Sequence, residues 1–427
     1  MVKVFVACPK HSETGGVELL HQLCHELNQN NHVCAKIWYI ADSIDNPQPE
    51  QYTKVYGNEY IVTSKPASDV VLVFPEIWTA MLDTFKNNQC VIFWESVDNY
   101  ISWSGRKTVP QEWNKLLHLT QSFYASDFLI KNGIDSERII YVSDYLNPVY
   151  MAGKHITKRV NRVLYNPKKG NAFTEQIIAQ LPDIDFAPIC DCTQQRVMEL
   201  METSKLYIDF GDHPGKDRMP REAAMCGCCI ITDTEGSAKF DYDVSIPSEY
   251  KFDRNTANLP AICNKIQYVL QHYDIITPYF DFYRDRIKHE KELFQAGVVE
   301  FVKRIYKPRF SIIIPAYNSA NYIRKALESV KSQVFTNYEL IVVCDSCMDN
   351  TEEVAKEYTD KVIIVNNHCD GPTRNRGIEE ACGDYILFMD DDDWWLHEYG
   401  IYRPVDWVCF SELHEFSRTF LKLTRIL

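Results

Sequence analysis

Tyr385-Ile-Leu-Phe-Met-Asp390-Asp391-Asp392-Asp393-Trp394-Trp395 is an apolar run that leads directly into four consecutive aspartates. The apolar residues predict a short buried strand. The carboxylates at its end offer oxygen ligands of the kind that Mg2+ and Mn2+ prefer, and substrate phosphates would complete the metal's shell. An acidic run taken alone is more often a solvated loop. The residues upstream decide between these two interpretations.

The chain before the aspartates alternates predicted strands with predicted helices. Strands are predicted at 310–317, 339–345, 361–365 and 385–389, and helices at 322–330, 354–358 and 372–381. This succession is typical of a parallel α/β sheet, in which ligands bind beyond the carboxyl ends of the strands. Tyr317, Asp345 and the aspartates all fall at such ends, so we expect them at one edge of the sheet.

Together these groups suit a nucleoside diphosphate. The Tyr317 ring can stack on a base, Asp345 can accept a base N–H, and a cation held by the acidic run can neutralise the diphosphate. Arg374 lies four residues before Ile378 on the same helix face, so we expect it to point inward and to contact phosphate or base.

Residues 309–395 resemble the nucleotide-binding half of a family 2 glycosyltransferase, which has the GT-A fold. The matching motifs are Ser311-Ile-Ile-Ile-Pro-Ala-Tyr-Asn318, Val342-Val-Cys-Asp-Ser-Cys-Met-Asp-Asn-Thr351, Gly371-Pro-Thr-Arg-Asn-Arg-Gly377 and Phe388-Met-Asp-Asp-Asp-Asp393. The resemblance implies that Pro315, Tyr317, Asp345 and Arg374 contact the nucleotide, that Asp390 contacts the ribose, and that Asp390 and Asp392 hold Mn2+ or Mg2+. It also implies a UDP-sugar donor and inversion at the anomeric carbon.

Two departures from the family pattern stand out. Cys344 replaces the first carboxylate of the usual pair, which creates a Cys-x-x-Cys with Cys347; a redox or zinc role is the weaker alternative, because structural zinc takes four ligands. Only a short tail follows Asp393, where the family places its acceptor pocket and catalytic carboxylate. We therefore expect a truncated GT-A domain and assign no general base. The acidic candidates that remain in the tail are Glu398, Asp406, Glu412 and Glu415. The tail 418–427 mixes basic and apolar residues, which is typical of a frayed helix or, less often, of a peripheral membrane contact.

The first 300 residues predict two further α/β layers. One contains predicted strands at 2–7, 33–40, 70–74, 90–94, 122–125 and 139–142, and the other begins at Arg162 and closes with a strand at 228–232. We expect Rossmann-like domains at 1–150 and 151–257, joined by a hinge at 141–155. Closing helices and a connector would occupy 258–307, before the GT-A domain at 308–427.

These two layers resemble a GT-B glycosyltransferase, distantly like family 4. The local matches are Thr14-Gly-Gly-Val-Glu18, Asn166-Pro-Lys-Lys-Gly170 and Pro220-Arg-Glu-Ala-Ala-Met-Cys-Gly227. Gly15 and Gly16 would let backbone N–H groups approach a ligand, Lys169 or Lys168 would pair with phosphate, and Glu222 would take ribose hydroxyls or act in catalysis. The resemblance implies retention at the anomeric carbon, and we expect no metal in this module.

The family's Glu-x7-Glu pattern is only half present. Glu222 matches the second glutamate, but Pro214 stands in place of the first. Lys216, Arg218 and Arg221 are predicted to lie just before or at a helix start, a favourable place for a diphosphate. A solvated basic turn is the plainer alternative.

Composition narrows the function classes. The 45 basic and 59 acidic residues give a net charge of −14, which disfavours a nucleic-acid partner. No apolar stretch approaches the length of a membrane helix, and the N-terminal Met-Val-Lys-Val-Phe-Val-Ala predicts a core strand and no signal peptide. We interpret the 15 cysteines as reduced residues of a cytoplasmic protein that could contact the inner membrane face peripherally.

The sequence thus predicts a glycosyltransferase that moves a sugar from a nucleotide donor to a glycan or lipid-linked acceptor in polysaccharide or glycoconjugate assembly. Two alternatives stay open at this point. The GT-A module could be a non-catalytic remnant that only binds a nucleotide sugar, or the N-terminal module could be a nucleotide-sugar epimerase.

Overall fold

The structure, a computed structural model, describes residues 1–152, 158–395 and 424–425. The chain forms two compact units, Met1–Tyr306 and Lys307–Leu427, and each is described by itself. The acidic residues Glu398, Asp406, Glu412 and Glu415 and nearly all of the basic and apolar tail lie outside the described residues. In the described part of the chain, no helix is both long and apolar enough to span a membrane.

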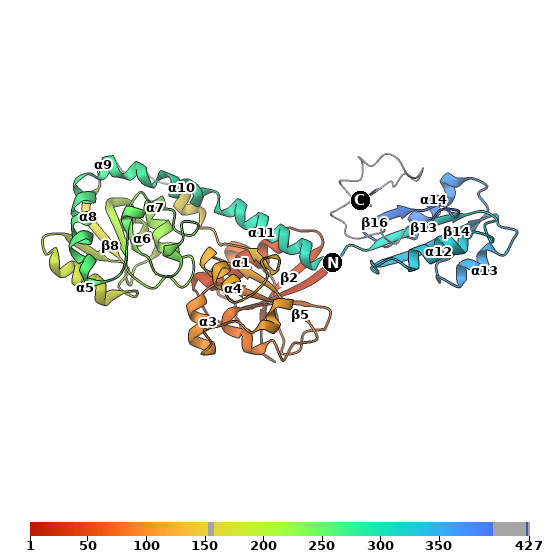
Figure 1. Cartoon of the computed structure of the whole chain (residues 1–427), viewed down its shortest axis with the longest axis horizontal. Helices are drawn as coiled ribbons and strands as arrows, with labels where there is room; N and C mark the ends of the chain where they lie inside the picture. The colour runs from red at the N-terminus through yellow and green to blue at the C-terminus, as the bar shows by residue number, and fades with distance from the viewer. Residues whose placement is uncertain (153–157, 396–423, 426–427) are drawn as a thin grey trace. The chain divides into compact units, whose positions relative to one another are not determined.

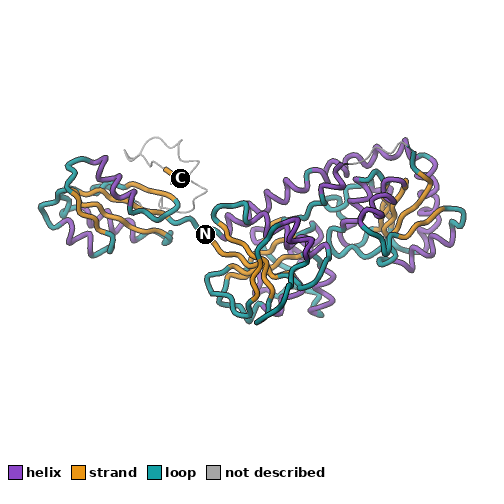
Figure 2. Tube along the Cα trace, turned by 180° about the vertical axis from the view of Figure 1, so that it is seen from behind, coloured by secondary structure: helices purple, strands orange, loops and turns teal. Residues whose placement is uncertain are grey.

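The first unit contains two parallel sheets, drawn with their helices in Figures 1 and 2. The first sheet has the order β3-β2-β1-β4-β5-β6-β7. Its strands are β1 (Val2–Ala7), β2 (Val33–Tyr39), β3 (Tyr60–Val62), β4 (Val71–Pro75), β5 (Gln89–Trp94), β6 (Leu117–Thr120) and β7 (Ile139–Tyr141), and its helices are α1 (Gly15–Leu27), α2 (Glu50–Tyr56), α3 (Val97–Ser104) and α4 (Phe123–Lys131). Alternate residues of β1 enter two different core clusters, so the sheet is buried on both faces.

The second sheet of this unit has the order β12-β11-β10-β8-β9, again with parallel strands. Its strands are β8 (Val160–Tyr165), β9 (Asp185–Pro188), β10 (Ser204–Asp209), β11 (Cys229–Asp233) and β12 (Lys251–Phe252), and its helices are α5 (Asn171–Gln180), α6 (Gln194–Thr203) and α7 (Arg218–Met225). The four helices that follow are α8 (Leu259–Gln271), α9 (Tyr273–Ile276), α10 (Asp281–Lys288) and α11 (Glu290–Ile305).

Helix α11 follows the second sheet in sequence but packs in the core of the first. Phe294, Val298 and Phe301 lie in the same buried cluster as Val4 and Leu20. The end of the segment 258–307 is therefore part of a core as well as a connector. Because α11 returns to the first sheet, it ties the two sheets of this unit together.

The second unit has a sheet of order β15-β14-β13-β16-β17. Its elements are β13 (Phe310–Ala316), α12 (Ile323–Lys331), β14 (Tyr338–Asp345), α13 (Thr351–Lys356), β15 (Val362–Val365), α14 (Asp370–Glu379), β16 (Tyr385–Phe388) and β17 (Thr424–Arg425). The first four strands are parallel and β17 pairs antiparallel with β16. The predicted α/β class is confirmed in both units.

One predicted strand of the first sheet is wrong. Residues 122–125 do not form a strand, because Ser122 caps α4 and its Oγ accepts the Ala125 N–H at 3.1 Å. The strand of this region is β6, which ends at Thr120. The apolar and hydroxyl residues after Gln121 belong to the first turn of a helix, where a serine cap satisfies an otherwise unpaired N–H.

Candidate functional site

The carboxyl ends of the second unit's strands surround a pocket of about 720 Å³. Ala316 pairs with Cys344 and Ile313 with Phe388, so β13, β14 and β16 end at the same edge. The pocket is lined by every residue that the sequence assigned to nucleotide or metal in this unit, namely Pro315, Tyr317, Asp345, Arg374, Asp390 and Asp392. The structure therefore brings these six residues together.

Asp345 organises the loop that closes one side of the pocket. Its carboxylate accepts hydrogen bonds from the backbone N–H groups of residues 367, 368 and 369 at 2.7–3.1 Å, and from the hydroxyls of Ser346 and Thr373. Burial acts to raise the pKa of Asp345, but these donors hold it well below its usual range. A carboxylate has about four acceptor positions, so the base contact predicted for Asp345 would have to replace one of these donors.

Arg374 and the first two aspartates also line this pocket. The Arg374 guanidinium donates to Asp390 Oδ1 at 2.7 Å and lies 3.4 Å from Asp370 Oδ2. Asp391 accepts the Tyr317 N–H at 3.1 Å, and burial raises its pKa. Asp390 and Asp392 are exposed in the pocket, whereas Asp391 holds the strand end in place.

Two tyrosine rings stand at the rim of this pocket. The Tyr317 side chain is 57% exposed and that of Tyr322 is 43% exposed. Exposed aromatic rings in a pocket are suited to stacking on a planar base. The sequence placed Asp391 at this edge with the other aspartates but gave it no role of its own. Tyr322 was missed because it was counted in the predicted helix 322–330, whereas α12 begins after it.

The Cys-x-x-Cys of this unit lies at the end of β14. Cys344 is fully buried, and burial raises the pKa of its thiol to about 12. The Cys347 thiol donates to the carbonyl of Ala316 at 3.4 Å. A buried thiol with such a pKa is a poor nucleophile and a poor metal ligand, which favours a packing role.

The first unit has a cleft of about 450 Å³ between the ends of its two sheets. Its lining includes the predicted residues Gly15, Gly16, Lys169, Lys216 and Arg218. The two glycines are the first residues of α1, where Thr14 Oγ1 accepts the Val17 N–H, so they lie in the first turn of a helix. Glu222 does not belong to the described lining; it is half-buried on α7, and burial raises its pKa to about 6.

The three cations around the start of α7 are not free. Arg221 is fully buried and pairs with Asp144 and Glu290, each at 2.7 Å. Lys216 pairs with the other oxygen of Glu290 at 2.7 Å. The predicted anion contact is thus wrong for Arg221, because a buried cation with two carboxylate partners serves the fold.

Arg218 and Lys169 remain at the cleft surface. Arg218 contacts Asp144 at 2.8 Å and also pairs with Glu18, yet its Nη2 is buried and has no hydrogen-bond partner among the described residues. Lys169 Nζ lies 2.5 Å from Asp217 Oδ1 and its side chain is one-third exposed. These two cations can therefore still meet an anionic ligand.

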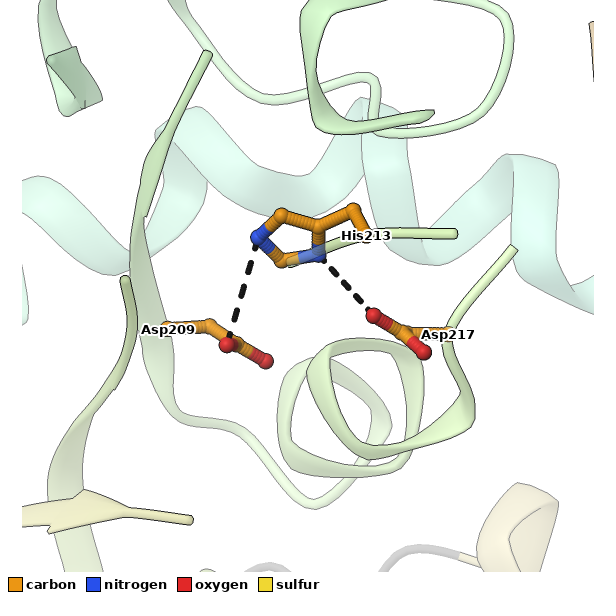
Figure 3. Close-up of side chains that lie close together, drawn as sticks. All are labelled: Asp209, His213 and Asp217. Carbon is orange, nitrogen blue, oxygen red and sulfur yellow. Dashed lines mark hydrogen bonds and ion pairs between the residues drawn. The ribbon is translucent and has the colours of Figure 1, made fainter. Parts of the chain in front are cut away.

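A buried histidine, His213, lies close to Asp209 and Asp217 (Figure 3). Within the described residues, Asp209, His213 and Asp217 are the one group of three whose side chains bring metal-ligating atoms within 4.8 Å of one another. His213 Nδ1 lies 2.9 Å from Asp217, and Nε2 lies 3.3 Å from Asp233 and 3.9 Å from Asp209. Burial acts to lower the His213 pKa, but the bonds to Asp217 and Asp233 raise it to about 10. With His213 protonated, this group is an ion-pair cluster in which Asp217 also pairs with Lys169.

Known proteins show similarity to the second unit. Residues 311–408 match the model of glycosyl transferase family 2. The chain is 41% identical over 90 residues to the UDP-Glc:alpha-D-GlcNAc-diphosphoundecaprenol beta-1,3-glucosyltransferase WfaP of Escherichia coli, which covers 20% of this chain and 36% of that protein. It is 33% identical over 96 residues to the glycosyltransferase GlyA of Streptococcus pneumoniae, covering 21% of this chain and 14% of that protein. The similarity of this segment is therefore to glycosyltransferases.

These relatives are matched only in part, since the chain spans 28–35% of the length of the first three curated relatives. A second likeness extends much further along the chain. The crystal structure of HepE from Anabaena in complex with UDP aligns with a TM-score of 0.51 at 11% identity, covering 71% of this chain and 100% of that one. The segment that matches family 2 is much shorter than the aligned 71% of the chain. The fold shared with HepE therefore includes the first unit.

Proposed function

We propose that the pocket of the second unit binds a UDP-sugar together with Mn2+ or Mg2+, and that the protein transfers this sugar to a glycan or lipid-linked acceptor. The observation that carries the proposal is the meeting of Tyr317, Asp390 and Asp392 in one pocket within the family 2 segment. UDP follows from the resemblance and agrees with the donor named for WfaP.

The donor set of the pocket fits a hard divalent cation. Asp390 and Asp392 present exposed carboxylate oxygens, and such metals are commonly bound by one or two carboxylates plus substrate phosphates. A bound cation would stabilise the charge on the departing diphosphate. When Asp390 binds a cation, Arg374 loses its partner at 2.7 Å and becomes available to a phosphate.

Calorimetric titration with UDP, in the presence and absence of Mn2+, tests this site. We expect manganese-dependent binding in the wild type and its loss in the Asp390→Ala/Asp392→Ala variant. Glu353→Ala/Asp360→Ala is the matched control, because it also removes two exposed carboxylates of this unit that do not line the pocket. No binding to the wild type would refute the donor site, whereas binding without sugar transfer to any acceptor would favour the non-catalytic alternative.

We further propose that the cleft of the first unit is a second, metal-independent donor site of the GT-B kind. The cleft is lined by Gly15 and Gly16 at the start of α1 and by Lys169 in the loop before α5. Arg218, whose Nη2 has no hydrogen-bond partner among the described residues, lines it too. A buried guanidinium nitrogen without a partner favours an anionic ligand such as a diphosphate. Epimerisation of a bound nucleotide sugar is the competing activity for this cleft.

Lys169→Gln and Lys168→Gln form a matched pair for this second site. Lys168 is exposed and does not line the cleft, so only Lys169→Gln should weaken binding of UDP-glucose measured in EDTA. UDP-glucose is the first probe because it occupies another structure of HepE. Equal affinities in the two variants would contradict the proposal, and conversion of the sugar without an acceptor would identify an epimerase.

A further inference from the structure

Two glutamates that the sequence did not single out lie in the cleft of the first unit. Glu95 follows β5 directly, and Glu76 follows β4 at the start of a short 3-10 turn, Glu76–Met81. Both line the cleft. The Glu95 N–H donates to Glu76 Oε2 at 2.9 Å, so the first glutamate fixes the backbone of the second.

The two carboxyl groups differ in how they are satisfied. Glu76 is 2% exposed, and its Oε2 accepts the bond from Glu95. Glu95 Oε1 is buried and has no hydrogen-bond partner in the described structure. Native proteins rarely leave a buried carboxyl oxygen unpaired, so this atom indicates a ligand that completes the site.

Two glycines, one from each half of the first unit, pack closely against Glu95. A Cβ on Gly16, at the start of α1, would lie 2.1 Å from Glu95 Oε2, and a Cβ on Gly215, in the loop before α7, would lie 2.1 Å from the Glu95 carbonyl oxygen. The Val97 N–H also donates to the Pro214 carbonyl at 3.0 Å. Glu95 therefore sits where the two walls of the cleft meet, on a rigid backbone.

The surroundings favour the neutral form of this carboxyl group. Burial, together with the nearby carboxylates of Glu76 and Asp144, raises the pKa of Glu95 well above its usual range, although Arg218 opposes this. Burial also raises the pKa of Glu76 to about 7. A neutral carboxyl group offers one O–H donor and one carbonyl acceptor, which matches two neighbouring hydroxyls of a sugar ring.

We propose that Glu95, positioned by Glu76, binds sugar hydroxyls in the cleft of the first unit. The ligand is a pyranose carrying adjacent hydroxyls, and it belongs either to the nucleotide sugar or to the acceptor. This inference rests on the second proposed function, a donor site in the same cleft. It adds the group that distinguishes a nucleotide sugar, or a free sugar, from the bare nucleotide.

Titrations in EDTA with UDP, UDP-glucose, and glucose in the presence of saturating UDP separate these cases. In Glu95→Ala we expect about a tenfold loss of affinity for the sugar-bearing ligand and unchanged affinity for UDP, since one or two hydrogen bonds are lost. A loss confined to UDP-glucose assigns the donor sugar, and a loss confined to glucose assigns the acceptor. Glu137→Ala, which alters an exposed glutamate of the same domain, is the control.

The isosteric Glu95→Gln variant guards against misfolding and tests the neutral form. Its amide also has a donor and an acceptor, so it should bind like the wild type at pH 6.5 but keep its affinity at high pH, where the wild type loses sugar affinity as Glu95 ionises. Folded Glu95→Ala with wild-type affinity for all three ligands would overturn this inference alone. A wild type that binds UDP but discriminates no sugar would also overturn it, and a wild type that binds neither UDP nor UDP-glucose in EDTA would overturn the second donor site with it.

Discussion

Asp345 shows how one carboxylate can shape a binding pocket through the hydrogen bonds that it accepts from a nearby loop. Its five donors connect the end of β14 to the residues that begin α14. Asp345→Asn should therefore destabilise the second unit by about 2 kcal/mol, the usual cost of losing hydrogen bonds to a charged group. Urea denaturation at pH 7 measures this, and Asp360→Asn, an exposed neighbour on the next loop, should change little.

The same residue predicts a pH dependence. Its pKa is lowered in the folded state, so its contribution is present above the unfolded pKa of about 4 and is lost as pH falls further, through the folded pKa. Wild-type stability should thus drop more steeply from pH 5 to pH 3 than that of Asp345→Asn. Parallel curves for the two proteins would contradict the assigned network.

His213 predicts the opposite trend at high pH. Its folded pKa of about 10 lies above the ordinary value of about 6.5, so its contribution is complete below pH 6.5 and is lost as pH rises through 10. His213→Gln should cost roughly 3 kcal/mol at pH 6, because the buried carboxylates lose a charged partner, and less at pH 10. Guanidinium denaturation at both values measures the difference, with His289→Gln, an exposed histidine, as control. A cost that does not change with pH would show that His213 is neutral when folded.

At the scale of elements, α11 is the clearest case of a segment whose role depends on distant packing. Phe301 is fully buried among residues of the first sheet, whereas Val299 two positions earlier is 50% exposed. Phe301→Ala should cost about 3–5 kcal/mol and Val299→Ala less than about 0.5 kcal/mol, measured by chemical denaturation. Similar costs for the two variants would mean that α11 does not pack on the first sheet in solution.

The fold and the pocket of the second unit could largely be predicted from the sequence, because the residue patterns that define them are local. Apolar runs ended at Tyr317, Asp345 and Asp390, and parallel pairing alone brings such ends to one edge. The resemblance then named roles that geometry alone did not. The hydrogen bonds that occupy Asp345 were not predictable, since they come from a loop whose backbone folds back on the strand end.

The cleft of the first unit was less predictable because its chemistry is non-local. Arg221 resembles an anion ligand in sequence, but its partners Asp144 and Glu290 lie far away along the chain. Glu76 and Glu95 each follow a strand that has no distinctive sequence signal. Their place in the cleft becomes visible only in the structure, where Gly16 and Gly215 pack closely against Glu95. Ser122 was misassigned for a local reason, since its cap bond to Ala125 begins α4 almost directly after β6.

At the scale of the molecule, the overall charge differs in sign from the cations that line the two pockets. The chain carries a net charge of −14, yet the two pockets contain cations from Lys169, Arg218 and Arg374. Each of these cations has a carboxylate partner in the structure. An anionic ligand must compete with those partners for the cations. Because salt screens the attraction between these cations and a phosphate, we expect nucleotide binding in both units to weaken as salt increases.

Each unit has its own hydrophobic core, which predicts two thermal transitions for the intact chain. The buried clusters around Val4 and Val163 belong to the first unit, and the cluster around Ile314 belongs to the second. In scanning calorimetry, Phe301→Ala should lower only one transition and Ile314→Ala only the other. Mn2+ with UDP at about 100 times its Kd should stabilise the second unit by about 2.7 kcal/mol and so raise the temperature of its transition. This rise should disappear in Asp390→Ala/Asp392→Ala. A single transition that every change shifts equally would instead show that the two cores unfold as one cooperative unit.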